Sequence, residues 1–186
     1  MRALVLAAAL LLGGCPWQQV VSPYDEVIDK GIVEFYEEFN LFVKDVADAA
    51  GKPEGTYEAN TKKYNVLDTK LDVLILRARS RSQGEGCKLE AKVYEKVAKL
   101  LPNDLPAEVR PEGQNAAGDA NACNTRLLEL VKRQLNSIRT IHSKTDKCGP
   151  RGQEISCLRK ASSEDALSIA NQSINAVSVV EAAKRN

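Results

Sequence analysis

The single histidine of this 186-residue chain, His142, is the first residue to consider as a site of chemistry. It could activate a nearby hydroxyl, such as Ser137, Ser143 or Thr145, or bind a ligand at the end of a helix. No second histidine and no Gly-x-Ser-x-Gly motif accompany it, so a hydrolase triad has no support. Multi-histidine zinc and di-iron sites are excluded too. The helix dipole by itself explains why a histidine is found near a helix C-terminus. Because the motifs named above are missing, we predict no enzymatic activity, no metal and no cofactor.

An arginine-rich run over residues 76–82 is the second candidate site. Arg77 and Arg81 lie four residues apart and therefore share one face of a helix. Guanidinium groups suit carboxylates and phosphates, so this pair could contact an anion or an acidic partner. The simpler interpretation is that basic residues in the last turn of a helix complement its dipole.

The first 14 residues have the pattern of a secretory signal peptide. Arg2 supplies the positive charge, and residues 3–12 form an unbroken apolar run. Ten residues rise about 15 Å as a helix, half of the roughly 30 Å hydrocarbon core of a bilayer. We therefore expect a cleaved signal and not a transmembrane anchor.

The residues Leu12-Gly13-Gly14-Cys15 resemble the lipobox of bacterial lipoproteins. The resemblance implies cleavage before Cys15, a diacylglycerol on its thiol and an acyl chain on the new amino group. Two or more chains hold a protein on a membrane, whereas one is marginal. Pro16 stands where enteric lipoproteins of the inner membrane have Asp, which favours the periplasmic side of the outer membrane. The alternative is an ordinary signal peptide followed by an unrelated cysteine.

The other four cysteines form an even set, which in an exported protein indicates disulfides. Pairing of nearest neighbours closes the shorter loops, so we predict the disulfides Cys87–Cys123 and Cys148–Cys157. Zinc binding and redox chemistry both lack a Cys-x-x-Cys motif, and haem attachment lacks Cys-x-x-Cys-His.

Beyond residue 21, apolar residues recur at the alternating spacings of amphipathic helices. Helices are expected over about 22–50, 57–82, 87–101, 119–142 and 162–180, with an irregular connection over 102–118. Ser22 and either Ser162 or Ser163 are the expected N-caps of the first and last helices. Residues 148–157 form a stapled loop with room for one turn of helix.

Strand signals are almost absent, so the predicted fold class is all-α. We expect an antiparallel bundle of four to five helices with two disulfides. The predicted organisation is a signal peptide (1–14), a lipid-anchored linker (15–21) and one helical-bundle domain (22–186).

The three phenylalanines, Phe35, Phe39 and Phe42, share the inward stripe of the first predicted helix. Such a stripe most often packs in a core. The alternative is that it lines an enclosed cavity of about 300 Å³ or more that holds a lipid or hydrophobic small molecule.

Charge is uneven along a mature chain that is formally neutral, with 25 basic and 25 acidic residues. Residues 23–50 carry a net charge of −6, whereas residues 57–82 and 119–147 each carry +3. We expect the acidic helix to lie between the two basic ones. The absence of a basic excess excludes a typical nucleic-acid binder.

Two further segments, Tyr24-Asp25 and the run from Gly55 to Asn60, resemble small Gram-negative lipoproteins of uncharacterised function. That resemblance implies a helical bundle on a membrane and supplies no activity. We therefore expect a non-enzymatic binding or structural role in the cell envelope, with contact to the membrane through Cys15 and to an envelope protein. The alternative role is a carrier or sensor for a lipid or hydrophobic small molecule.

Overall fold

Four long helices account for most of the structure, a computed structural model that describes residues 24–81, 93, 96 and 123–185. They are α1 (Glu26–Asp48), α2 (Tyr57–Arg81), α4 (Cys123–Thr140) and α5 (Lys160–Ala183). A 3-10 turn, Pro53–Gly55, lies between α1 and α2, and a π-helical turn, Ile141–Thr145, continues α4. Two short strands follow, β1 (Lys147–Cys148) and β2 (Ile155–Ser156), which pair antiparallel.

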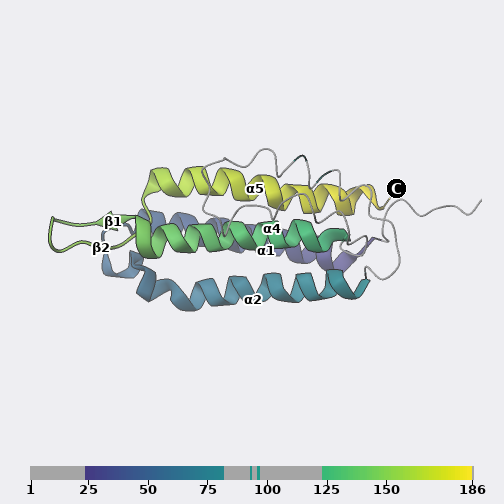
Figure 1. The fold of residues 1–186 in the computed structure, drawn as a ribbon, viewed down its shortest axis with the longest axis horizontal. Helices are drawn as coiled ribbons and strands as arrows, with labels where there is room; N and C mark the ends of the chain where they lie inside the picture. The colour runs from purple at the N-terminus through teal and green to yellow at the C-terminus, as the bar shows by residue number, and fades with distance from the viewer. Residues whose placement is uncertain (1–23, 82–92, 94–95, 97–122, 186) are drawn as a thin grey trace, which may run out of the picture.

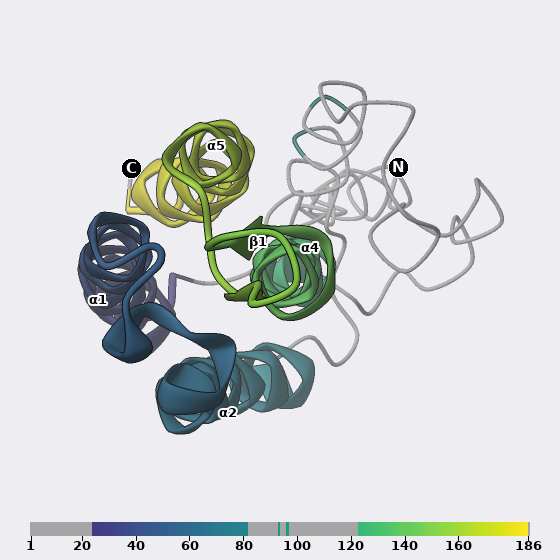
Figure 2. The same ribbon diagram turned by 90° about the vertical axis from the view of Figure 1, so that its left-hand side faces the viewer.

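The four helices run alternately up and down along one long axis (Figure 1). Viewed along that axis they occupy four corners, with α1 and α4 each packed on α2 and α5 (Figure 2). The β1–β2 hairpin and the α1–α2 connection lie together at one end, here called the hairpin end. The start of α1 and the end of α5 lie at the other, here called the terminal end.

The core consists of the inward apolar stripes that the spacing predicted. In α1 these residues are all buried, from Ile28 through the three phenylalanines to Val46. The matching stripes of the other helices are centred on Leu71, Leu135 and Val177, which are also buried. The predicted periodicity is therefore confirmed for the helices that the structure describes.

The first residues of α1 and α5 differ from the prediction, and in α5 the reason is a hydrogen bond to a residue outside the helix. Asp25 caps α1, and its side chain accepts hydrogen bonds from the backbone N–H groups of Val27 and Ile28; the predicted cap, Ser22, lies outside the described residues. Helix α5 begins at Lys160, earlier than predicted, because the buried Asp146 accepts the Arg159 backbone N–H at 2.8 Å and fixes the entry to the helix.

The loop between Cys148 and Cys157 is a β-hairpin and not a helical turn. Gly149 and Gly152 have φ angles of +110° and +85°. Residues with a Cβ rarely adopt such positive φ angles, whereas glycine does so readily. The two glycines allow the chain to reverse, and the register places Lys147 opposite Ser156. The predicted helical turn was wrong because these two glycines favour a tight reversal.

The predicted position of the acidic helix was also wrong. Helix α1 packs on α2 and α5, so the basic helix α4 lies diagonally opposite it. The two basic helices are neighbours, and cross-helix ion pairs offset their like charge. Lys132 contacts Asp68 at 3.3 Å and Asp72 at 2.6 Å, and Arg79 contacts Glu129 at 2.6 Å.

The prediction of a mostly helical fold is confirmed, although the two-stranded sheet was not expected. The disulfide Cys148–Cys157 is present, with a Cα–Cα distance of 5.8 Å. Cys87, Cys15 and the connection over 102–118 lie outside the described residues. Of the predicted third helix, Val93 and Lys96 are described; both are helical, and Val93 packs against the core.

Candidate functional site

His142 is fully buried in the π-helical turn at the hairpin end. Its Nε2 lies 3.0 Å from the Gly55 carbonyl oxygen, and its Nδ1 lies 3.0 Å from the Tyr64 hydroxyl. Because a carbonyl only accepts hydrogen bonds, Nε2 carries the proton and Nδ1 accepts from Tyr64. Burial lowers the pKa of His142, which favours this neutral form.

The hydrogen-bond partners of His142 come from two other parts of the bundle, α2 and the α1–α2 connection. Both ring nitrogens are engaged by Tyr64 and Gly55, so neither activates a serine or threonine. The Tyr57 ring lies edge-on at 5.8 Å, and Arg139 donates from Nε to the Tyr57 hydroxyl at 2.9 Å. The cluster fastens the α1–α2 connection to the end of α4.

Arg77, predicted as an anion contact, forms an ion pair within the bundle. Its Nε lies 2.9 Å from both carboxylate oxygens of Asp25, the N-cap of α1. Burial alone would raise the pKa of Asp25, but hydrogen bonds from Arg77 and from the backbone of Ile28 and Val27 outweigh it and lower the pKa. The side chain of Arg81 lies outside the described residues.

Glu181, which the sequence analysis missed, holds three helices together at the terminal end. It is fully buried and accepts hydrogen bonds from the backbone N–H of Asp25 at 2.9 Å and from the side chain of Asn124. The side chain of Lys184 is buried, and its Nζ lies 2.9 Å from the same carboxylate. The contact with Lys184 is local, but no local pattern could reveal the contacts with Asp25 and Asn124, which lie 156 and 57 residues away in the sequence.

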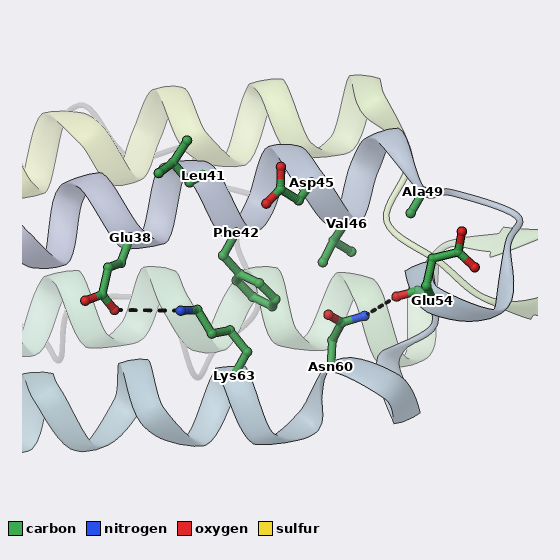
Figure 3. Close-up of a pocket in the computed structure, with 9 residues that line it drawn as sticks. All are labelled: Glu38, Leu41, Phe42, Asp45, Val46, Ala49, Glu54, Asn60 and Lys63. Atoms are coloured by element: carbon green, nitrogen blue, oxygen red, sulfur yellow. Dashed lines mark hydrogen bonds and ion pairs between the residues drawn. The ribbon is translucent and has the colours of Figure 1, made fainter.

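Two separate hollows lie along the α1–α2 pair, and we refer to the two together as the groove. The hollow nearer the hairpin end has a volume of about 590 Å³ and is lined by Glu38, Leu41, Phe42, Asp45, Val46, Ala49, Glu54, Asn60 and Lys63 (Figure 3). The second has a volume of about 430 Å³ and is lined by Val27, Lys30, Gly31, Glu34, Thr69, Lys70, Val73 and Leu74. We call them the acidic hollow and the valine hollow.

The acidic hollow combines an apolar wall with two uncompensated carboxylates. Phe42 and Val46 point into the space between the helices (Figure 3). Glu38 is ion-paired with Lys63 at 3.8 Å and with Lys70, and the hydrogen bond from Lys70 lowers its pKa. The carboxylates of Asp45 and Glu54, by contrast, have no ion pair or side-chain hydrogen bond among the residues that the structure describes.

The groove also carries exposed aliphatic side chains. Leu41 is 63% exposed beside the acidic hollow, and Val73 is 58% exposed in the valine hollow. Elsewhere on α2, Val66 and Leu76 are also exposed. These residues could have been found in the sequence, because they are apolar but lie outside the three- and four-residue spacing of the buried stripe.

Of the three phenylalanines, Phe42 lines one of the two hollows described above. Phe35 and Phe39 are buried in the core and stack on each other with ring centroids 5.4 Å apart. Phe42 packs edge-on against Tyr64 at 4.8 Å and lines the acidic hollow. Core packing is therefore confirmed for all three phenylalanines, which belong to one buried cluster.

Comparisons of the chain with family models, with curated proteins and with solved structures give no match. Among the described helices, none has the length and apolar character needed to cross a bilayer. Within the same residues, no three His, Cys, Asp or Glu side chains are grouped closely enough to hold a metal ion.

Proposed function

We propose that this protein is a lipid-anchored helical module of the bacterial cell envelope that binds a partner and catalyses no reaction. The groove between α1 and α2 is the observation on which the binding role rests. Leu41 and Val73, in its two hollows, are each more than half exposed, and exposed apolar side chains gathered at a hollow are typical of a binding surface. The full architecture in this proposal is an antiparallel bundle of four to five helices with a second disulfide, Cys87–Cys123.

The partner that fits the groove is an envelope protein segment with apolar side chains and a lysine or arginine. Phe42 and Val46 offer apolar contact, and burying one Leu-sized side chain there contributes about 1.5–3 kcal/mol. Asp45 and Glu54 attract a cation at the rim, and an exposed ion pair adds at most about 1 kcal/mol. Apolar burial therefore supplies the affinity, and the carboxylates select the charge of the partner.

The proposed anchor is Cys15, carrying two or more acyl chains. Nine residue steps separate Cys15 from Tyr24, a reach of at most about 32 Å. Tyr24 precedes α1 at the terminal end, so this end faces the membrane and the groove runs away from it. The outer membrane is favoured over the inner membrane because Pro16 replaces the retention signal Asp.

The binding role is tested by photo-crosslinking in intact cells. A photoreactive residue replaces Leu41 in the groove, or Val179 on the outer face of α5, which is matched in polarity and 53% exposed. The proposal predicts an adduct from position 41 and none from 179, with a captured peptide that is apolar and basic. Equal adducts from both positions, or an acidic captured peptide, would contradict it.

A second candidate function is a carrier for a small amphiphile in the acidic hollow. Its volume of about 590 Å³ falls within the range of small-molecule sites. The ligand would then be cationic or neutral, because Asp45 and Glu54 repel an anionic headgroup. A fluorescent alkylamine that binds the wild-type protein but not a Phe42→Asp variant would support this function, and an equally bound fatty-acid anion would contradict it.

A further inference from the structure

The hairpin and its two junctions at the hairpin end carry more basic than acidic side chains, and Glu58 of α2 is the neighbouring acid that interacts with one of them, Lys147. We call these basic side chains the basic tip; they are exposed and lie on the hairpin and at its two junctions: Lys144, Lys147, Arg151, Arg159 and Lys160. Residues 144–160 contain these five against two acidic residues, a net charge of +3. Both acids have other roles: Asp146 is buried and accepts the Arg159 backbone N–H, and Glu154 accepts the Gly152 N–H at 3.1 Å.

The basic tip differs from the arginines that the sequence analysis selected. At the terminal end, Arg77 is paired with Asp25 and Arg185 with Asp29. None of the five basic-tip residues forms an ion pair with any residue that the structure describes. The guanidinium group of Arg159 donates instead to the backbone oxygen of Lys147, at 2.6 and 3.3 Å. The five unpaired basic residues of the tip therefore lie at the opposite end of the bundle from Arg77.

The hairpin that carries the tip is fastened to the bundle by a disulfide and by hydrogen bonds, and Cys157 at its end is fully buried. The disulfide Cys148–Cys157 closes the hairpin, and the Cys157 N–H donates to the Asp146 carbonyl at 3.4 Å. The Ser156 hydroxyl accepts the Tyr57 N–H at 2.9 Å and donates to Glu58 at 2.7 Å, which ties β2 to the start of α2. Residues 149–154 themselves are exposed. Because the disulfide and these hydrogen bonds already hold the hairpin in place, less conformational entropy is lost when the basic tip binds a ligand.

We propose that the basic tip binds a carboxylate-rich polymer of the cell wall, such as peptidoglycan. Separate, solvated lysine and arginine side chains suit a polymer with repeated carboxylates, which needs no enclosed pocket. The choice of the wall over an anionic bilayer rests on the proposed function, because Cys15 places the membrane at the terminal end. The 23-residue helix α1 spans about 35 Å, so the tip faces away from that membrane.

Co-sedimentation with purified peptidoglycan sacculi tests this proposal, using the mature chain in detergent. The variant Lys147→Glu with Arg151→Glu is compared with Lys44→Glu with Lys62→Glu. All four lysines and arginines are exposed and lack an ion pair among the described residues, so both variants change net charge equally. We expect binding about tenfold weaker for the tip variant and within about twofold of wild type for the control. Equal losses in the two variants would overturn the proposal.

Two further arms of the experiment separate the sources of binding. The variant Cys148→Ser with Cys157→Ser keeps every charge and is expected to bind several-fold more weakly; unchanged binding would contradict a preorganised tip. Phosphatidylglycerol vesicles replace sacculi in the second arm, and tighter binding to vesicles would overturn the wall assignment. The assay uses purified protein, so its failure is distinguishable from failure of the anchor or the groove, which are measured in cells.

Discussion

The substitution His142→Phe removes both hydrogen bonds of the buried imidazole while keeping an aromatic ring in its place. The Tyr64 hydroxyl and the Gly55 carbonyl then lose their partner inside the bundle. Each buried group left unsatisfied costs about 1–3 kcal/mol. We therefore expect the free energy of unfolding at pH 7.5 to fall by about 2–5 kcal/mol, and the melting temperature by about 5–15 °C.

The same variant makes a second prediction about pH. Burial lowers the pKa of His142 in the folded protein below its unfolded value of about 6.5. The unfolded chain therefore binds more protons as the pH falls, so wild-type stability decreases from about pH 7 towards pH 5. Because His142 is the only histidine, the Phe variant should lose this slope. The carboxyl groups of Asp25 and Glu38 also have lowered pKa values, but they change the stability of the protein only at more acidic pH.

Urea denaturation followed by circular dichroism at pH 7.5, 6.5 and 5.5 measures both effects. Tyr64→Phe provides a milder variant, which leaves only the Nδ1 acceptor without its donor and should cost about 1–2 kcal/mol. A loss below about 0.5 kcal/mol in His142→Phe, or an unchanged slope between pH 7.5 and 5.5, would refute the structural role of the imidazole.

Three other variants test separate parts of the account. Replacing Cys148 and Cys157 by serine should lower the free energy of unfolding by about 2–3 kcal/mol, as measured by thermal denaturation. A variant as stable as the wild type would show that the disulfide does not stabilise the fold. Gly55→Ala should destabilise by about 1–3 kcal/mol, because its Cβ would clash with the Ala49 carbonyl oxygen; calorimetry that shows wild-type stability would contradict this packing. Cys15→Ala should release the protein from membranes on cell fractionation, and its persistence in the membrane fraction would sink the anchor proposal.

Sequence reasoning succeeded where the determinants are local. The inward stripe of α1 repeats every three or four residues, so its burial follows from helical geometry. The disulfide Cys148–Cys157 was predictable because its cysteines are only nine residues apart. Helix types and their approximate positions followed from the same short-range patterns.

The parts that sequence reasoning missed depend on which helices become neighbours. Asp25 meets Arg77 across 52 residues, and His142 meets Gly55 across 87, so no local pattern indicates either contact. The groove forms because α1 packs beside α2, which the sequence does not reveal. The sequence also does not reveal that Lys63 and Lys70 both form ion pairs with Glu38, so that Asp45 is left without one.

The central claim is that the acidic hollow of the groove recognises a basic, apolar partner. Its most direct test is the yield of the crosslinked adduct from position 41 in intact cells after reversing the charge of the rim. Asp45→Lys with Glu54→Lys is predicted to lower the adduct yield several-fold, because repulsion of a basic partner replaces attraction, whereas Glu164→Lys with Asp165→Lys, an equal change at exposed positions on α5, should leave the yield unchanged. An undiminished yield in the first variant, or an equal loss in both, would contradict the claim.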